Sequence, residues 1–342
     1  MKNRLLITPL FFLVFLSTLA QTQSSIFENL EFRFIGPEGN RTIAIAGIPE
    51  DPMTTYIGAA SGGLWKTTDA GTTWKPIFDN QEASSIGSLA ITPTNPDIVW
   101  VGTGETFVIR PAHAMGDGIY KSIDGGKTWK NMGLEKTGRI GRVIVHPTNP
   151  DIVYAAALGH TYGKQQERGV YKTVDGGETW KRIFFIDENT GAAELAIDPK
   201  NPNRLLVGMW SIQIKTWGLN SGGPGGGVYR TTDGGENWEP LNTKGLPGGK
   251  ENPVGKTAVA ISHSNPNIVY ALFEIGSPAL YRSEDFGETW TLQTRNHDIA
   301  ERAPYYTRMA VSTTDPNELY FASVKFSISK DGGKTIKGGY SA

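Results

Sequence analysis

An eight-residue pattern close to Ser/Thr-x-Asp-x-Gly-x-Thr-Trp occurs six times and constrains this chain more than any other feature. In the last copy Ile336 replaces the tryptophan. The aspartates of the six copies lie 46 to 58 residues apart, at Asp69, Asp124, Asp175, Asp233, Asp285 and Asp331. A repeat period of this length indicates an array of similar supersecondary units rather than an ordinary globular domain.

A second pattern, an Asn-Pro or Asp-Pro turn between two apolar runs, keeps the same period. In the second repeat the turn at residues 93–96 separates the runs 86–91 and 98–102, and two further short runs follow at 118–122 and 128–130. Short runs rich in β-branched and aromatic residues, bounded by Gly, Pro, Asn and Asp, indicate strands. Four strands per repeat predict an all-β fold, a β-propeller of about six four-stranded antiparallel blades.

The sequence divides into three parts. Residues 1–20 form an export signal, residues 21–41 an amino-terminal segment, and residues 42–342 the propeller. The predicted blades cover about 42–80, 85–132, 139–185, 191–242, 254–294 and 305–337. The chain ends soon after the sixth motif, so we consider two alternatives. Either the chain is a fragment of a larger propeller, or residues 27–34 close the sixth blade as its outer strand.

The amino terminus predicts export. Lys2 and Arg4 precede an apolar run over residues 5–19, and small residues end at Ala20. There is no cysteine in the chain, so lipid attachment at a lipobox is excluded and no disulfide is expected. Loss of residues 1–20 moves the net charge from −1 to −3, which gives no general attraction to nucleic acid or to anionic membranes. We expect a secreted or periplasmic protein with no stable membrane insertion after signal cleavage.

The repeated aspartates are interpreted as structural. The chain reverses over Asp-x-Gly, so positive φ is predicted for Gly71, Gly126, Gly177, Gly235, Gly287 and Gly333. Each carboxylate is placed to accept backbone N–H groups of its turn, which lowers its pKa, whereas a general acid needs a raised pKa. Six equivalent hairpins spread around a ring also do not supply two carboxylates about 5–10 Å apart, as glycoside hydrolysis requires.

These motifs are identified as the Asp-box, or bacterial neuraminidase repeat. With Phe32 to Pro37, Ala60 to Thr67 and Ala156 to His160, the chain resembles exported bacterial propellers that are similar to the sortilin amino-terminal domain. Members of that group are often labelled glycosyl hydrolases. The Asp-box identifies the blade and carries little information on activity, because it occurs in hydrolases, receptors and assembly factors alike.

The resemblance to two kinds of hydrolase is examined residue by residue. Xyloglucanase-type enzymes carry Tyr-x-x-x-Asp-x-Gly-Gly in the first blade, and in the matching run, residues 56–63, Ala60 stands in place of the catalytic Asp. Their second catalytic carboxylate belongs to a second propeller, whereas this chain contains one array. The resemblance to sialidases allows a formal arginine triad of Arg33, Arg142 and Arg308, with Tyr305 or Tyr306 as nucleophile.

Alignment of the six innermost strands on the Asn/Asp-Pro turn predicts one residue per blade at the same level. These residues are Ala44, Ser88, Arg142, Glu194, Ala258 and Arg308. Alternation directs them to one face, which we expect to line the central channel. We expect Arg142 and Glu194 to form a salt bridge along a water-filled channel, with a charged ring for an anionic or polyhydroxy ligand as the alternative.

Three long irregular segments, at 103–113, 159–168 and 210–227, lie between the second and third strands of blades two, three and four. Equivalent connections emerge on one face, where ligands commonly bind. The candidate ligand-binding residues there are Glu105, Arg110, His113, His160, Tyr162, Trp210 and Trp217. The histidines show no metal-ligand spacing, and we expect neither a metal nor another cofactor.

Three functions therefore remain open. The favoured one is an exported scaffold that binds a protein, peptide or glycan and no nucleic acid. The second is a glycoside hydrolase, for which Glu105 and Glu194 are the best available catalytic carboxylates. The third is an assembly factor for another exported complex.

Overall fold

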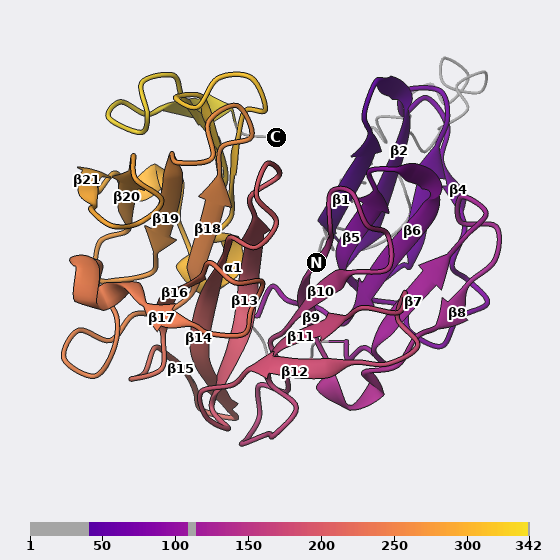
Figure 1. The fold of residues 1–342 in the computed structure, drawn as a ribbon, viewed down its shortest axis with the longest axis horizontal. Coiled ribbons are helices and arrows are strands. Elements are labelled where there is room, and N and C mark those ends of the chain that lie inside the picture. The colour runs from indigo at the N-terminus through magenta and orange to yellow at the C-terminus, as the bar shows by residue number, and fades with distance from the viewer. Residues whose placement is uncertain (1–40, 109–113, 341–342) are drawn as a thin grey trace, which may run out of the picture. The chain divides into compact units, whose positions relative to one another are not determined.

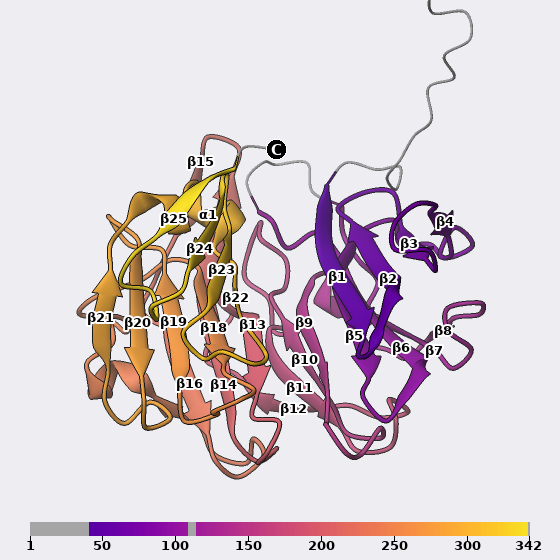
Figure 2. The same cartoon turned by 90° about the horizontal axis from the view of Figure 1, so that it is seen from above.

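The computed structural model describes residues 41–108 and 114–340, which belong to one compact unit. The export signal and residues 27–34 lie outside the described residues. Six antiparallel sheets follow one another around a central channel, with the first strand of each sheet innermost (Figures 1 and 2). The predicted β-propeller is confirmed. Within the described part of the chain, no helix has the length and apolar character needed to cross a membrane.

The strands of blades 1 to 3 are as follows. Blade 1 contains β1 (Thr42–Ile48), β2 (Asp51–Ala59), β3 (Leu64–Thr67) and β4 (Lys75–Pro76). Blade 2 contains β5 (Ile86–Thr92), β6 (Asn95–Thr103), β7 (Ile119–Ser122) and β8 (Lys130–Asn131). Blade 3 contains β9 (Ile140–Val145), β10 (Val153–Ala157), β11 (Gly169–Thr173) and β12 (Lys181–Phe184).

Blade 4 differs from the others by an additional strand. It contains β13 (Thr190–Ile197), β14 (Leu205–Lys215), β16 (Gly227–Thr231) and β17 (Glu239–Pro240), and β15 (Gly218–Ser221) pairs only with β14. Blade 5 contains β18 (Thr257–Ile261), β19 (Val269–Phe273), β20 (Ala279–Ser283) and β21 (Thr291–Thr294). Blade 6 contains β22 (Met309–Val311), β23 (Leu319–Ala322), β24 (Phe326–Ser329) and β25 (Lys337–Tyr340). The helical turns are η2 (Glu135–Thr137), η3 (Leu241–Lys244), η4 (His297–Ile299) and α1 (Ala303–Tyr306).

One detail differs from the sequence-based expectation. The segment after Trp210 is not irregular throughout, because the apolar alternation of Ile212 and Ile214 extends β14 and lets it pair with β15. Among the described strands, β25 is the fourth strand of blade 6, and closure of this blade by residues 27–34 stays a prediction.

Each aspartate motif closes the hairpin between the third and fourth strands of its blade. In blade 2, Asp124 accepts hydrogen bonds from Ser122 Oγ at 2.8 Å and from the Thr128 backbone N–H at 2.9 Å. The predicted positive φ is confirmed at all six glycines, with values between 85° and 99°. Hydrogen bonds from the threonine of the same motif are the main cause of the lowered pKa of Asp69 and Asp331, which falls to about 2. The motif is therefore structural in its geometry and in the direction of its pKa shift.

Five of the hydrophobic clusters are each shared by two successive blades. Between blades 1 and 2, for example, Tyr56 and Leu64 pack against Ile86 and Val99. Among the described residues no such cluster joins blade 6 to blade 1. Only a small group at one end of the channel, containing Ile43, Ala60, Phe107 and Tyr305, connects them.

Polar contacts also join successive blades, and we call these contacts latches. The third strand of each of blades 1 to 5 carries a Lys or Arg that reaches into the following blade. Lys66, Lys121 and Lys172 donate to the carbonyl oxygens of Gly125, Gly176 and Gly234, each at 3.0 Å. Arg230 donates to the Phe286 carbonyl at 2.7 Å, and Arg282 donates to Asn317 Oδ1 at 2.6 Å. Each of the four carbonyls belongs to the residue after a motif aspartate, so these latches fix one blade on the hairpin of the next.

Candidate functional site

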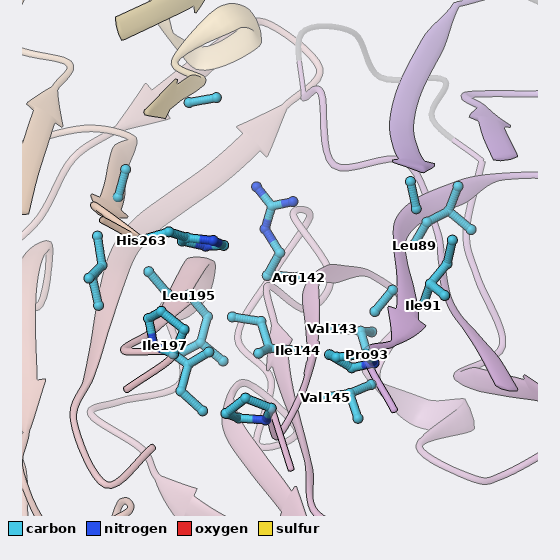
Figure 3. A pocket seen from close by; sticks show the side chains of 18 of the residues that line it. Leu89, Ile91, Pro93, Arg142, Val143, Ile144, Val145, Leu195, Ile197 and His263 are labelled. Atoms are coloured by element: carbon cyan, nitrogen blue, oxygen red, sulfur yellow. The ribbon is translucent and has the colours of Figure 1, made fainter. Parts of the chain in front are cut away.

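A channel cavity of about 470 Å³ lies between the innermost strands. Its walls are aliphatic and include Leu89, Ile91, Val143 and Leu195, while Arg142 lies in the middle of the labelled side chains (Figure 3). The prolines of four Asn/Asp-Pro turns and the exposed His263 also line it. The cavity is therefore mostly aliphatic, with a charged group at its inner side, and is not a channel lined by charge throughout.

The charged group is an ion pair between adjacent blades. Arg142 on β9 donates through Nε and Nη2 to both carboxylate oxygens of Glu194 on β13, with the Nη2–Oε2 distance at 2.7 Å. The predicted salt bridge is therefore present. Arg308, just before β22, brings its Nη1 to 3.8 Å from Glu194 Oε2. Burial opposes ionisation of Glu194, but the attraction of the two guanidinium groups outweighs it and lowers the pKa of Glu194.

Lys256 is a third cation in this region, and it was not among the residues predicted from the sequence. Its side chain is buried, with Nζ 3.3 Å from the Tyr305 carbonyl oxygen and above the rings of Phe107 and Trp210. Burial, reinforced by repulsion from Arg308, lowers the pKa of Lys256 to about 7. No motif marks Lys256, since its surroundings come from segments far away in the sequence.

We call Arg142, Arg308 and Lys256, together with Glu194, the basic cluster. Arg142 and Arg308 share the carboxylate of Glu194, while Lys256 interacts with both Glu194 and the neighbouring Glu274. Arg308 also keeps Nε buried without a hydrogen-bond partner among the described residues. A partly buried guanidinium group that shares its carboxylate with a second arginine is incompletely paired, so this arrangement favours the binding of an anion.

Glu105 lies in a neighbouring ion pair. It contacts Arg41 at the start of blade 1, and its backbone oxygen accepts a hydrogen bond from Arg139 Nε at 2.9 Å. Burial raises the pKa of Glu105, although Arg41 and Arg139 act in the opposite direction. Glu105 is 4% exposed, so it does not present its carboxylate to the loop face as expected from the sequence.

The six residues predicted at one level of the innermost strands do not form a charged ring. Ser88 is buried and accepts a hydrogen bond from the Val143 N–H of the next blade at 2.8 Å. Ala258 packs in the cluster between blades 5 and 6, and Ala44 in the cluster between blades 1 and 2. Only Arg142, Glu194 and Arg308 meet, because the other positions are used for packing between blades.

The remaining loop candidates do not converge on one site. Trp210 is fully buried and donates to Ser221 Oγ at 2.9 Å, so it belongs to the core. His160 is half-buried and lines, with the exposed Tyr162, a separate polar pocket of about 610 Å³. Trp217 is 84% exposed in the β14–β15 hairpin. Arg110 and His113 lie outside the described residues.

The positions compared with hydrolases are occupied as follows. Ala60, at the place of the xyloglucanase Asp, is fully buried in the apolar group with Phe107 and Tyr305. Of the formal sialidase triad, Arg33 lies outside the described residues, while Arg142 and Arg308 both contact Glu194. Tyr305 accepts a hydrogen bond from Arg41, and Tyr306 lies beside it.

One group of side chains has the composition of a metal site. Ligand atoms of His297, Asp298 and Glu301 lie within 4.8 Å of one another. The Lys325 ammonium lies 3.5 Å from Asp298 Oδ1 and 4.0 Å from Glu301 Oε1, so it already balances these carboxylates.

The chain is similar to a sortilin family model and to xyloglucanases. The Sortilin-Vps10 family model, described as sortilin, neurotensin receptor 3, matches residues 117–245. The chain is a sortilin-like β-propeller. A Paenibacillus xyloglucanase is 28% identical over 210 residues, which cover 56% of this chain and 19% of that enzyme. A probable oligoxyloglucan-reducing end-specific xyloglucanase of Neosartorya fischeri is 22% identical over 363 residues, covering 90% of this chain and 41% of that protein.

Solved structures support the fold of this sortilin-like propeller. An ancestral GH74 enzyme superposes with a TM-score of 0.62 and 19% identity, covering 86% of this chain and 35% of that enzyme. YCF48 bound to D1 peptide gives a TM-score of 0.58 and 16% identity, with 91% of this chain and 87% of that chain covered. The chain thus spans less than half the length of the hydrolases described here.

Proposed function

We propose that this sortilin-like propeller is an exported binding protein whose channel receives an acidic polypeptide segment. The observation that carries the proposal is the basic cluster, in which the partly buried guanidinium groups of Arg142 and Arg308 share one carboxylate, Glu194, beside the aliphatic channel cavity. An acidic side chain placed next to Arg142 and Arg308 would balance this charge, and apolar side chains would cover the walls.

Two features favour a polypeptide over a sugar. Apart from Arg142 and His263, the labelled walls of the channel cavity are aliphatic (Figure 3), whereas sugar sites usually offer several aromatic faces for stacking. A volume of about 470 Å³ is within the usual range of ligand pockets and has room for several side chains. The similarity in length and fold to YCF48, whose structure contains D1 peptide, gives independent support.

Binding of a fluorescein-labelled peptide of alternating leucine and glutamate, followed by fluorescence anisotropy, tests the proposal. We expect the same peptide with glutamine in place of glutamate to bind at least tenfold more weakly, since a lost charge-assisted hydrogen bond costs about 1.5–3 kcal/mol. Arg308→Met should weaken binding of the glutamate peptide, and Arg295→Met, which changes an exposed arginine outside the cluster, should leave it unchanged.

Glu194→Gln provides the opposite test. It removes the internal competitor for the arginines, so affinity for the glutamate peptide should rise. Affinity should also fall as the pH rises through 7, because Lys256 then loses its proton. Equal binding of the glutamate and glutamine peptides would contradict the proposed function.

Glycoside hydrolysis is the second candidate. It is favoured by the xyloglucanase relatives and by the opposite pKa shifts of Glu105, which is raised, and Glu194, which is lowered, as in an acid–base pair. Both carboxylates are only 4% exposed and bound to arginine, and Ala60 supplies no carboxylate, so we place it second. Release of reducing ends from xyloglucan that disappears in Glu105→Gln and in Glu194→Gln would reverse this order.

A further inference from the structure

The sequence of latches stops at blade 6. The position of the five latch cations is occupied in blade 6 by Ile328 on β24, which has no charged group. No lysine or arginine in the described part of the chain donates to the carbonyl of Ala70, the residue after the motif aspartate of blade 1. We call the boundary between blade 6 and blade 1 the seam, and the residues that the structure describes form no latch across it.

The residue that follows each motif aspartate supports this distinction. A Cβ added at Gly176 would lie 3.1 Å from Lys121 Nζ, and one added at Gly125 would lie 3.3 Å from Lys66 Nζ. Three of the four latched carbonyls belong to glycine, and the fourth belongs to Phe286. In blade 1 the same position holds Ala70, at a φ of 55°, and no cation within residues 41–108 and 114–340 donates to its carbonyl.

The described residues at the seam also form no apolar cluster comparable with those at the other boundaries. A cavity of about 440 Å³, the seam cavity, lies between residues of β1 and of β22, β23 and β24. Ile45 and Phe326 line it and are 67% and 43% exposed, whereas the five latched boundaries enclose clusters of buried residues. At about 25 cal/mol per Å² of apolar area, a boundary without such a cluster is held much more weakly.

Contacts across the seam are concentrated at one end of the channel. Arg41 of blade 1 donates to the Tyr305 hydroxyl in α1 and contacts Glu105 from blade 2. Arg308 Nη2 lies 3.3 Å from Thr106 Oγ1. With the small apolar group around Phe107, these contacts hold blade 6 beside blade 1.

The basic cluster lies directly behind the seam. Arg142 lines both the channel cavity and the seam cavity, and Arg308 lines the seam cavity. We propose that the ring opens at the seam between blades 6 and 1 and that this opening exposes the basic cluster from the side. Its use as a ligand entrance rests on the function proposed above, whereas the opening itself does not.

Hydrogen exchange of the full chain, resolved by blade, tests the opening. Amides of β1 and β22 should be at least tenfold less protected than those of β9 and β13, since local opening sets exchange rates. Arg41→Met should reduce protection of β1 and β22 by a further fivefold or more and leave β9 and β13 unchanged. Lys172→Met is the matched control, because it removes a latch and should affect only the boundary between blades 3 and 4.

Arginine modification by phenylglyoxal tests the exposure without any peptide ligand. Arg308 should react in the wild type and at least fivefold faster in Arg41→Met, and Lys172→Met should leave its rate unchanged. Equal protection from hydrogen exchange in all six innermost strands would overturn the proposal. So would a rate of Arg308 modification that stays the same in variants in which β1 and β22 lose protection. If hydrogen exchange and phenylglyoxal modification give the expected results but the glutamate peptide does not bind, the proposed function is refuted and the opening of the ring is supported.

Discussion

Removal of one latch gives the sharpest test of how this propeller is held together. Lys121 on β7 places Nζ 3.0 Å from the Gly176 carbonyl oxygen of blade 3 and 4.9 Å from the ring centroid of the fully buried Trp100. Lys121→Met keeps most of the aliphatic side chain but removes the charge. We therefore expect packing to persist and the polar part of the contact to be lost.

The expected loss follows from the two interactions. A hydrogen bond from a charged donor contributes about 1.5–3 kcal/mol, and a cation above an indole ring adds about 0.5–1 kcal/mol. These contributions share one ammonium group and do not add fully, so the free energy of unfolding should fall by about 2–3 kcal/mol. Urea unfolding followed by tryptophan fluorescence measures this difference.

Lys130 supplies the matched control. It also joins blade 2 to blade 3, through a 2.9 Å contact with Glu178, but both side chains are more than 60% exposed. An exposed pair of this kind contributes about 0–1 kcal/mol, so Lys130→Met should change stability by less than about 0.5 kcal/mol. Equal losses in the two variants would show that the buried latch has no special role, and the reasoning would be refuted.

Three further predictions follow from local geometry. Gly176→Ala should destabilise the fold by about 1–2 kcal/mol, since it adds a Cβ at positive φ beside a latch, whereas Ala70→Gly should leave stability unchanged or raise it slightly; urea unfolding of both measures the difference. The folded chain releases the Lys256 proton near pH 7, whereas the unfolded chain holds it to about pH 10.4. The free energy of unfolding should therefore increase with pH across this window. In Lys256→Met this increase between pH 7 and pH 9 should be absent from the measured free energy of unfolding. Trp210→Ala should cost about 3–5 kcal/mol and Trp217→Ala almost nothing, as melting temperatures should show, because the first side chain is buried and the second exposed.

The fold could be predicted because its signals are local. The glycine that needs positive φ, the aspartate that bonds its own turn and the Asn/Asp-Pro turn are each contained within a few residues. Their repetition identifies the blades. The pairing of Arg142 with Glu194 followed from the same register, since adjacent innermost strands place equivalent residues side by side.

The site was harder to predict because burial depends on distant segments. Glu105 and Trp210 both lie in segments that the sequence predicts to be loops. In the structure Arg41 of blade 1 contacts Glu105, and Trp210 packs in the core and donates a hydrogen bond to Ser221 of β15. Lys256 has no motif, and the rings that cover its ammonium group come from blades 2 and 4. Its pKa is lowered by this burial and by repulsion from Arg308. A search for isolated lysines at the start of an innermost strand is the sequence signal that could have found it.

The latch places its two halves in different repeats, so a blade is not an independent module. A duplicated or transplanted repeat keeps its neighbours only if the repeat before it supplies a cation and its own motif carries a residue that leaves room for that cation. The pair formed by Lys121 and Gly176 is therefore expected to change together, while Ala70 is released from this requirement. In other chains built from these repeats, the same pairing of a third-strand cation with a motif glycine would indicate which blades are neighbours in the ring.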